Sequence, residues 1–286
     1  IPIGKEAKNT KIRQINPSQI MFICPCETPE GQPVGIVMNF TLMTKVSHNT
    51  PTYIIRDIVD KCSCFINIDD VEISSEDTKV FVNGIIIGFS ESAEDLVDEF
   101  REFRDGGAVP YDVSIGYNPD DDEIHIACDA GRLLRPIFTL EGNKLKAKTE
   151  DGHDWDVLVA RGLIRYVDNT EIGDAVIAFS QEELLKYRND YCEISPALML
   201  GVMGSIIPWP DHSQSPRNCY QTSMGKQAMS MYALSHNTRT DTISHVLGYP
   251  QRPIVSTRAS TLMGFDNMPS GINAIIAIAC YSGFNQ

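Results

Sequence analysis

The chain has 286 residues, of which 42% are hydrophobic and 22% charged, and its net charge at pH 7 is -14. This composition is ordinary for a soluble protein, and the length is sufficient for two or three compact units. No apolar run approaches the roughly 20 residues of a membrane-spanning helix, and no signal peptide opens the chain. These observations exclude a helical membrane protein.

The negative charge is confined to the middle of the chain. Residues 51–195 carry 14 Lys and Arg against 32 Asp and Glu, whereas residues 1–50 and 196–286 each carry five against three. Proteins that bind nucleic acid usually present basic surface, so the net charge alone argues against that class. An acidic middle facing solvent and weakly basic flanks facing a polyanion are nevertheless compatible in one molecule.

The eight cysteines favour reduced, partly buried side chains over a metal site. Cys24 and Cys26, and Cys62 and Cys64, form C-x-C pairs, whereas structural zinc sites usually use paired C-x2-C knuckles. We therefore expect no zinc and a reducing compartment.

Residues 1–50 are predicted to be loop-rich, and residues 51–115 to form a small α+β unit. Asn83-Gly84 between two apolar runs is the strongest short-range signal for a hairpin. A helix is expected near residues 93–104, with Ser92 as its N-cap and Gly106-Gly107 at its end.

Residues 116–195 are predicted to be mostly β. Expected features are strands at 124–127 and 133–138, a charged hairpin around 141–144 and a short helix near 181–188. The acidic cluster at 120–123 lacks the alternating ligand spacing of an EF-hand loop and is interpreted as a solvated turn.

Residues 196–286 have a different composition, poor in acidic residues and rich in small, amide, hydroxyl and Met residues. The continuous apolar run at 273–284 is typical of a strand in a sheet that is covered on both faces. Because natural chains rarely stop in such a strand, we interpret the sequence as an internal fragment of a larger protein.

One helix start in this region carries chemistry. Ser215 as N-cap and Pro216 as first helical residue predict the start of a helix. Arg217 then lies in the first turn, where a cation opposes the helix dipole. Either an anion such as phosphate binds there, or Arg217 pairs with a carboxylate elsewhere; the residues themselves leave both open.

Other sites have weaker support. No nucleophile elbow, Walker loop, dinucleotide fingerprint or His-rich metal motif occurs. Asp211 and His212 could be read as a catalytic pair, but sequence neighbours seldom point at one another and no positioned nucleophile accompanies them. A hydrolase is therefore disfavoured.

Long motifs in order along the chain closely resemble the second-largest, β-like subunit of multisubunit DNA-directed RNA polymerases of eukaryotic and archaeal type. The resemblance spans essentially all residues and is carried by Cys24-Pro-Cys-Glu-Thr-Pro-Glu-Gly31, Val80-Phe-Val-Asn-Gly84, Asp129-Ala-Gly-Arg132, Ser205-Ile-Ile-Pro-Trp-Pro-Asp-His212, Ser215-Pro-Arg-Asn218, Met224-Gly-Lys-Gln-Ala-Met229, Tyr249-Pro-Gln251 and Ala277-Ile-Ala-Cys-Tyr-Ser-Gly-Phe-Asn-Gln286.

The resemblance implies an α+β, multi-domain fold in four regions. Residues 1–50 correspond to the end of the fork and lobe-adjacent region. Residues 51–115 and 116–195 correspond to an α+β unit and a β-rich unit of the external region, and 196–286 to the start of the β-rich hybrid-binding domain. The acidic charge of 51–195 fits an outer surface.

It also implies roles for individual residues in nucleotidyl transfer. Arg217 matches the arginine that reaches the triphosphate of the incoming nucleotide, with Tyr220 nearby, and Lys226 and Gln227 match residues that contact RNA near its 3′ end. The implied wall of the active centre comprises Arg13, Gln14 and Glu30, and the fork loop carries Lys5 and Lys8.

The implied partners are the largest polymerase subunit, the other core subunits, template DNA, the RNA–DNA hybrid and nucleoside triphosphates, with no membrane. Mg²⁺ would be held mainly by carboxylates of the largest subunit, so this piece is expected to be inactive alone. The location would be the nucleus for a cellular protein, or host cytoplasm, viral factory or virion for a viral one.

Three departures from the family pattern favour a divergent lineage such as a large DNA virus. Met21-Phe22 replaces the usual aromatic-Gly pair, Met38 replaces a usual Lys, and the external region is short. The rival interpretation is a free-standing acidic interaction protein derived from such a subunit. Retention of Arg217, Lys226 and Glu30 together favours the polymerase.

Overall fold

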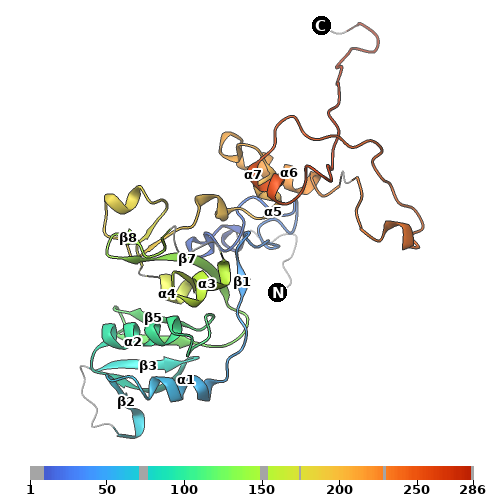
Figure 1. The fold of residues 1–286 in the computed structure, drawn as a ribbon. Helices are drawn as coiled ribbons and strands as arrows, with labels where there is room; N and C mark the ends of the chain where they lie inside the picture. Colours follow the sequence, from blue (N-terminus) through green and yellow to red (C-terminus); the bar gives the residue numbers. More distant parts are fainter. Residues whose placement is uncertain (1–9, 71–76, 149–153, 174, 228–229, 285–286) are drawn as a thin grey trace. The chain divides into compact units, whose positions relative to one another are not determined.

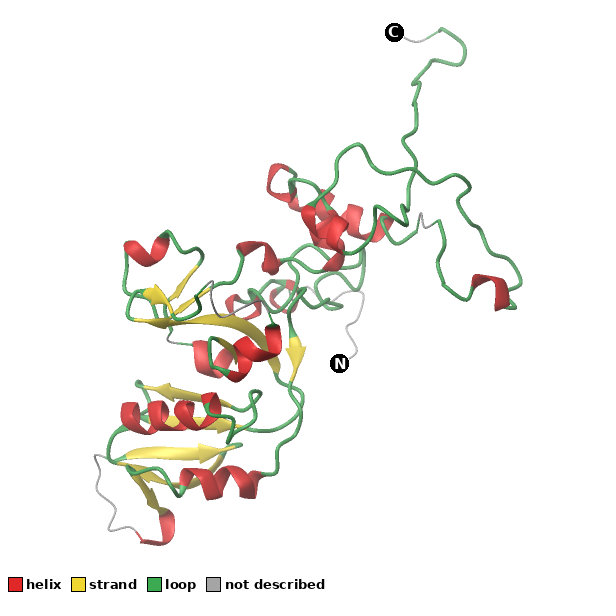
Figure 2. Cartoon of the chain, viewed as in Figure 1, coloured by secondary structure: helices red, strands yellow, loops and turns green. Residues whose placement is uncertain are grey.

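The computed structural model describes residues 10–70, 77–148, 154–173, 175–227 and 230–284 (Figure 1). The chain divides into two compact units. The first consists of Ile1–Asn16, Ile23–Phe40 and Leu200–Gln286, and the second of Pro17–Phe22 and Thr41–Met199. The chain is a mixed α+β structure in which helices, strands and long loops alternate (Figure 2).

The second unit contains a five-stranded sheet in the order β2-β4-β3-β6-β5. Its strands are β2 (Phe65–Asn67), β3 (Thr78–Val82), β4 (Ile85–Ser90), β5 (Ser114–Asn118) and β6 (Glu123–Ala127). All neighbours are antiparallel except β3 and β6, which pair in parallel with Val80 opposite Ile124. The sheet thus combines strands from both of the regions, 51–115 and 116–195, that were expected from the sequence.

Two helices, α1 (Thr52–Val59) and α2 (Ala93–Asp105), share one core with this sheet. Alternate residues of a strand point to opposite faces, and the core-facing set is fully buried. Its central members are Ile55, Val59, Val80, Leu96, Phe100, Ile115, Ile124 and Ile126. On the other face Phe81 stacks on His125 at 5.1 Å, and Lys79 pairs with Glu123 at 3.1 Å.

The hairpin and the helix expected in this region are confirmed. Asn83 and Gly84 have φ values of 49° and 78°, the left-handed pair that a two-residue hairpin turn requires. The Ser92 side chain accepts a hydrogen bond from the backbone N–H of Asp95, and α2 ends at Gly106.

A six-stranded sheet is organised around one long strand, β7 (Leu133–Glu141). β7 pairs antiparallel with β1 (Lys45–Val46), β9 (Ile164–Val167), β11 (Tyr191–Cys192) and β8 (Lys144–Leu145), and β11 pairs in parallel with β10 (Ile177–Ala178). The β7–β8 pairing confirms the expected charged hairpin. The expected helix near 181–188 is a single 3-10 turn, Glu183–Leu185.

Short helices complete the chain. The 3-10 turns are Lys11–Arg13, Pro17–Gln19, Ile68–Asp70, Pro196–Met199, Pro210–His212 and His236–Thr238, and the α-helices are α3 (Trp155–Ala160), α4 (Asn169–Ile172), α5 (Val202–Ile206), α6 (Ser215–Met224) and α7 (Arg258–Leu262). Among the described residues of 1–50, the helical turns cover only 11–13 and 17–19 and the one strand covers only 45–46, as expected for a loop-rich segment.

Buried ion pairs join the elements of the second unit. Arg104 of α2 donates two hydrogen bonds to the Glu171 carboxylate of α4, at 2.7 and 2.9 Å, and both side chains are almost fully buried. Arg132 donates to Asp168 at 2.9 Å, and Arg135 to Glu193 at 2.6 Å. Buried charges of this kind are tolerated only when paired.

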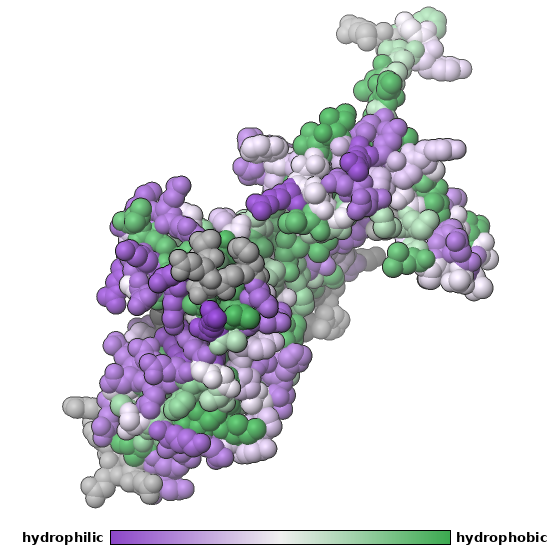
Figure 3. Space-filling view, in the orientation of Figure 1, coloured by the Kyte–Doolittle hydropathy of each residue, from purple (hydrophilic) through white to green (hydrophobic). Residues whose placement is uncertain are grey.

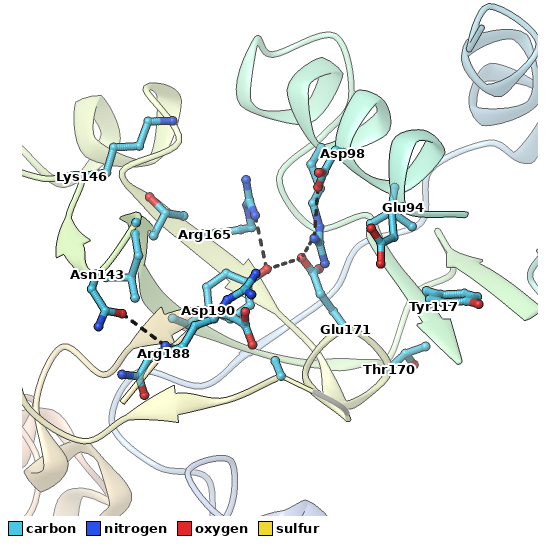
Figure 4. A pocket seen from close by; sticks show the side chains of 18 residues that line it. Glu94, Asp98, Tyr117, Asn143, Lys146, Arg165, Thr170, Glu171, Arg188 and Asp190 are labelled. Atoms are coloured by element: carbon cyan, nitrogen blue, oxygen red, sulfur yellow. Dashed lines mark hydrogen bonds and ion pairs between the residues drawn. The ribbon is translucent and has the colours of Figure 1, made fainter. Parts of the chain in front are cut away.

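A polar cavity of about 880 Å³ lies beside this network (Figure 4). Glu171 and Arg165 line it, and the Tyr191 hydroxyl contacts both side chains at 3.3 Å. Arg165 also donates to Asp105 at 2.7 Å. The charges of Glu171 and Arg165 are therefore neutralised by partners within the protein.

The apolar run at 273–284 does not form the expected strand. No regular element follows α7 in the described residues, and the side chains of Ile275, Ile278 and Tyr281 are fully exposed. Figure 3 shows hydrophobic residues, in green, among more polar ones along this extended stretch. A strand requires a neighbour for its backbone groups, and within the described residues only the isolated bridge between Gln251 and Gly271 lies in this region.

We predict that Glu171→Ala destabilises the second unit by about 3–5 kcal/mol, because it leaves the buried Arg104 guanidinium uncompensated. Urea unfolding followed by fluorescence measures the change. Although burial acts to raise it, the arginines lower the pKa of Glu171. The pair's contribution is therefore present at neutral pH and is lost as pH falls through that lowered pKa.

The matched control is Asp98→Ala, which removes the solvent end of the same network. Asp98 is 78% exposed and lies 3.6 Å from Arg101, so the expected loss is within about 1 kcal/mol. Equal losses for the two variants would contradict a special role for the buried pair.

Candidate functional site

Helix α6 carries the most informative motif of the sequence. Ser215 is its first helical residue, and Gln214, in an extended conformation, is the N-cap. The expected Ser215 N-cap is therefore wrong by one position. The Gln214 carbonyl already accepts hydrogen bonds from the N–H groups of Arg217 and Asn218, so the helix begins before Ser215 can cap it. Pro216 follows within the first turn.

Two buried polar side chains hold α6 to neighbouring segments. The Thr222 hydroxyl, only 1% exposed, lies 2.7 Å from the carbonyl oxygen of Cys219 within the helix and 3.4 Å from that of Cys26. Asn218, also buried, donates to the Pro210 carbonyl at 2.8 Å. The Thr222 contact joins the helix to the Cys-Pro-Cys-Glu-Thr-Pro-Glu-Gly loop, and the Asn218 contact joins it to the 3-10 turn Pro210–His212.

The conformation of the loop is held by hydrogen bonds to backbone carbonyl groups. Cys24 donates its N–H to the Asn39 carbonyl at 2.8 Å, and the Asn39 amide donates to the Glu27 carbonyl at 3.1 Å. Arg13 donates to the carbonyls of Gln32 and Val34. Gly35 makes this approach possible, because its φ is +72° and a Cβ there would collide with the Arg13 backbone.

An open cleft of about 620 Å³ lies between the loop and the helix. It is lined by Pro29, Glu30, Arg217, Tyr220, Ser223, Met224 and Gln227. Four residues expected in an active centre from the sequence therefore line one cleft: Glu30, Arg217, Tyr220 and Gln227.

Arg217 lies over the Tyr220 ring, with 5.5 Å between the guanidinium carbon and the ring centroid. It is exposed, and the ion pairs of the described residues, formed within 4.0 Å, do not include it. Of the two explanations left open by the sequence, a carboxylate partner within this chain is not found among those residues. A first-turn cation without a partner is suited to an external anion.

Lys226 has a partner that the sequence did not predict. Its ammonium lies 2.6 Å from the carboxylate of Glu27, which is nearly buried. Glu27 is an acidic residue within the Cys-Pro-Cys-Glu-Thr-Pro-Glu-Gly loop, and only the fold brings it to a residue almost two hundred positions away. The Lys226 side chain is still 47% exposed, so one ion pair leaves donors of its ammonium facing solvent.

The remaining expected residues are distributed as follows. Arg13 is half-buried and serves the loop through the two carbonyls above, while Gln14 is exposed; neither lines the cleft. Lys5 and Lys8 lie outside the described residues. Asp211 and His212 do approach each other, at 3.6 Å, but both are mostly exposed.

The described residues contain no group of three or more His, Cys, Asp or Glu side chains arranged to hold a metal ion. In the same part of the chain, no helix is long and apolar enough to cross a bilayer.

Three family models match successive segments. They are RNA polymerase Rpb2 domain 3 at residues 2–46, domain 4 at residues 80–141 and domain 6 at residues 203–286. The cleft residues of α6 fall in the domain 6 match, and the loop with Glu30 falls in the domain 3 match.

Relatives come from distant lineages. The chain is 40% identical along its whole length to a probable DNA-directed RNA polymerase II subunit RPB2 homolog of Invertebrate iridescent virus 6. It is also 40% identical to DNA-directed RNA polymerase II subunit 2 of Arabidopsis thaliana. Over 99% of its length it is 35% identical to the Rpo2 subunit of Sulfolobus acidocaldarius. It spans about a quarter of the length of these relatives.

The matched segments thus define a multisubunit RNA polymerase component. The chain belongs to the family of second-largest subunits of DNA-directed RNA polymerases, the Rpb2 family.

We predict that Thr222→Val loosens α6 from the loop. Valine has nearly the same shape but removes the hydroxyl that contacts the Cys26 carbonyl, at a cost of about 1 kcal/mol. Hydrogen–deuterium exchange should accelerate in both α6 and residues 24–28.

Ser223→Ala is the matched control, because the Ser223 hydroxyl donates to the same Cys219 carbonyl at 3.1 Å but does not reach the loop. Exchange that accelerates equally in residues 24–28 of both variants would show that the Thr222 contact does not hold the loop.

Proposed function

We propose that this chain is the part of a polymerase subunit that contacts the nucleotide and the hybrid during template-directed nucleotidyl transfer. Arg217 binds the triphosphate of the incoming nucleotide, with Tyr220 supporting the guanidinium. Lys226 and Gln227 contact RNA near its 3′ end, and Glu30 with Arg13 and Gln14 forms part of the wall. Lys5 and Lys8 make the contacts of the fork loop.

The observation that carries the proposal is the exposed Arg217 guanidinium, unpaired among the described residues and lying at the start of a ten-residue helix. Partly free N–H groups and the positive end of the helix dipole add to its charge. With no acidic residue in that first turn, the arrangement favours a polyanionic ligand. Arginine also suits phosphate because its planar fork donates two parallel hydrogen bonds.

The chemical role of such a site is electrostatic. Charge that develops on the phosphates during transfer is stabilised by donors already in place, and the same contacts orient the nucleotide for attack. Mg²⁺ would supply the remaining stabilisation in the assembled enzyme, mainly on ligands of the largest subunit. This piece is accordingly inactive in isolation.

The regional assignment belongs to the same proposal. Residues 1–50 form the end of the fork, 51–115 and 116–195 the external region, and 196–286 the start of the hybrid-binding domain. The partners are the largest and other core subunits, template DNA, the RNA–DNA hybrid and nucleoside triphosphates. The location is the nucleus, or the viral factory, host cytoplasm or virion in a virus.

The alternative is an acidic interaction protein that retains these residues as relics. It is favoured by the charge of the middle region, but it gives no reason for Arg217, Tyr220, Gln227 and Glu30 to line one cleft. The two functions differ in what Arg217 does, which a single substitution tests.

We predict that Arg217→Ala lowers the rate of single-nucleotide addition at subsaturating nucleotide by about 10- to 150-fold, the equivalent of about 1.5–3 kcal/mol for a charge-assisted hydrogen bond. Arg217→Lys recovers only part of the loss, because an ammonium cannot donate two parallel bonds. The assay uses the assembled polymerase on an RNA–DNA scaffold across nucleotide concentrations.

Arg258→Ala is the matched control. Arg258 is also exposed and begins helix α7 of the same unit, but it does not line the cleft. Normal addition by Arg217→Ala, or a loss no greater than that of Arg258→Ala, would make Arg217 a surface residue and overturn the assignment.

We also predict that the acidic turn of the external region is dispensable for nucleotide addition. Asp120→Asn with Asp121→Asn should leave the rate within about twofold, because water and salt screen the charges of these exposed side chains. Asp122 is kept, since its carboxylate accepts hydrogen bonds from Thr78 and Tyr117. A tenfold loss of elongation rate in the double variant would contradict the regional assignment.

A further inference from the structure

The polar cavity of the second unit, about 880 Å³ in volume, is lined by charged residues of both signs. Figure 4 shows Lys146 and Arg188 on one side of it and Glu94 and Asp98, both from helix α2, on the other. Whether such a cavity attracts a ligand depends on which of these charges already have partners within the protein. The Glu171 carboxylate at its base is already paired with arginine.

The other acidic lining residues also have stabilising neighbours. The Asp190 carboxylate accepts a hydrogen bond from the backbone N–H of Val176 at 2.8 Å. Asp98 lies 3.6 Å from the guanidinium of Arg101. Glu94 is in the first turn of α2, where the helix dipole stabilises a negative charge. The negative charges around the cavity are therefore compensated within the protein.

Two basic lining residues are not compensated in this way. Arg165 pairs with Asp105 at 2.7 Å. Lys146 and Arg188 are exposed, and the ion pairs within 4.0 Å that the described residues form include neither of them. Carboxylates are not scarce in the second unit, which carries 32 Asp and Glu against 15 Lys and Arg. Cations left unpaired beside a cavity in such a unit are suited to an anion from another molecule.

The segments that carry these two cations are fastened to each other. Asn143 lies in the turn between β7 and β8, and Lys146 follows β8 directly. The Asn143 amide donates to two carbonyl groups of the loop 184–189, at 2.6 and 2.8 Å, and accepts from the N–H of Asn189 at 3.4 Å. Arg188 belongs to that loop. The two cations are thus held on connected segments before any ligand binds, which lowers the entropic cost of binding.

We propose that this cavity binds an acidic peptide segment of another subunit of the assembled polymerase, with carboxylates of the segment paired to Lys146 and Arg188. Arginine donates two parallel hydrogen bonds to a carboxylate, and lysine adds a point charge. Polar lining groups such as Thr170 and Asn189 suit the backbone of a peptide. The proposal shares with the proposed function only the assembly with other subunits, and it is independent of the nucleotide contacts.

The charge of the surroundings favours a peptide over a nucleic acid. A nucleic acid strand carries a phosphate at every nucleotide, and the second unit, with 17 more acidic than basic residues, repels such a polyanion. A peptide can bring one or two carboxylates among neutral residues. That number matches the two unpaired cations at the cavity.

The test is zero-length cross-linking of the nuclease-treated, assembled polymerase with a water-soluble carbodiimide. The reagent activates a carboxylate, and a lysine amine at ion-pair distance attacks it, releasing the urea and leaving an amide. After trypsin digestion, mass spectrometry finds a link at Lys146 in peptide 145–148 and a link at Lys144 in peptide 133–146. Lys144 is the control, since it is exposed on the same hairpin but does not line the cavity.

The expected result is a link from Lys146 to an Asp or Glu of another subunit, about 10-fold more abundant than any link from Lys144, as a charge-assisted contact implies. A Lys146 that links only within its own subunit, or to no carboxylate at all, would overturn the proposal. So would a Lys146 link that forms only when nuclease treatment is omitted, because the ligand would then be a nucleic acid.

Charge variants test the second cation. Arg188→Glu should lower the yield of the Lys146 link about 10-fold, because it replaces a charge-assisted hydrogen bond by repulsion. Arg188→Lys should keep that link and add one at position 188. The matched control is Arg56→Glu, a charge reversal at an exposed arginine of α1 that does not line the cavity. An equal loss in Arg56→Glu would show that the effect comes from the net charge of the unit and would refute the site.

Discussion

The contact on which the candidate site depends is the Thr222 hydroxyl, which bridges residues 196 positions apart in the sequence. A buried hydroxyl must satisfy its donor, and this one lies between its own helix and the loop at Cys26. This contact holds the loop beside the helix. Glu30 of the loop and Arg217 of the helix can therefore line one cleft, although neither residue lies in a sheet. The Lys226–Glu27 pair reinforces the same junction just beyond the C-terminal end of the helix. Because loop and helix share this contact, a change at either is transmitted to the other.

The second unit must fold although it carries an excess of 17 negative charges, 32 Asp and Glu against 15 Lys and Arg. Three of its buried carboxylates, those of Asp168, Glu171 and Glu193, are each held by a guanidinium, those of Arg132, Arg104 and Arg135 respectively. The remaining excess is left on exposed turns such as 120–121, where water and salt screen it. Pairing of the buried charges also links α2 to α4, two elements that belong to different parts of the unit. Arg104, Arg132 and Arg135 thus stabilise the fold of the acidic region, whereas Arg217 has no carboxylate partner among the described residues.

Features governed by neighbouring residues could be predicted from the sequence, and features governed by distant ones could not. Asn83-Gly84 and Ser92 determine their hairpin and helix through local backbone geometry, so their positions were confirmed. The parallel pairing of β3 with β6 depends on sheet formation across some forty residues and leaves no periodic signal of its own. The same is true of the Lys226–Glu27 pair and of the Arg13 contacts to the loop carbonyls. The expected strand at 273–284 is not observed for a related reason. An apolar composition favours a strand, but it does not determine which other strand would pair with it.

The two units also differ in what they leave unsatisfied. In the second, apolar side chains enter one large and two smaller hydrophobic clusters, and the buried carboxylates of Asp168, Glu171 and Glu193 are paired with arginines. In the first, Arg217 has no ionic partner among the described residues, and large apolar side chains such as Ile275 and Ile278 are fully exposed. Covering each such side chain would contribute about 1.5–3 kcal/mol, and exposed apolar stretches of this length mark contact surfaces rather than solvated ones. An unpaired cation beside a cleft and an uncovered apolar stretch on one unit have the same physical meaning: each is suited to a partner group that the described residues of this unit do not supply.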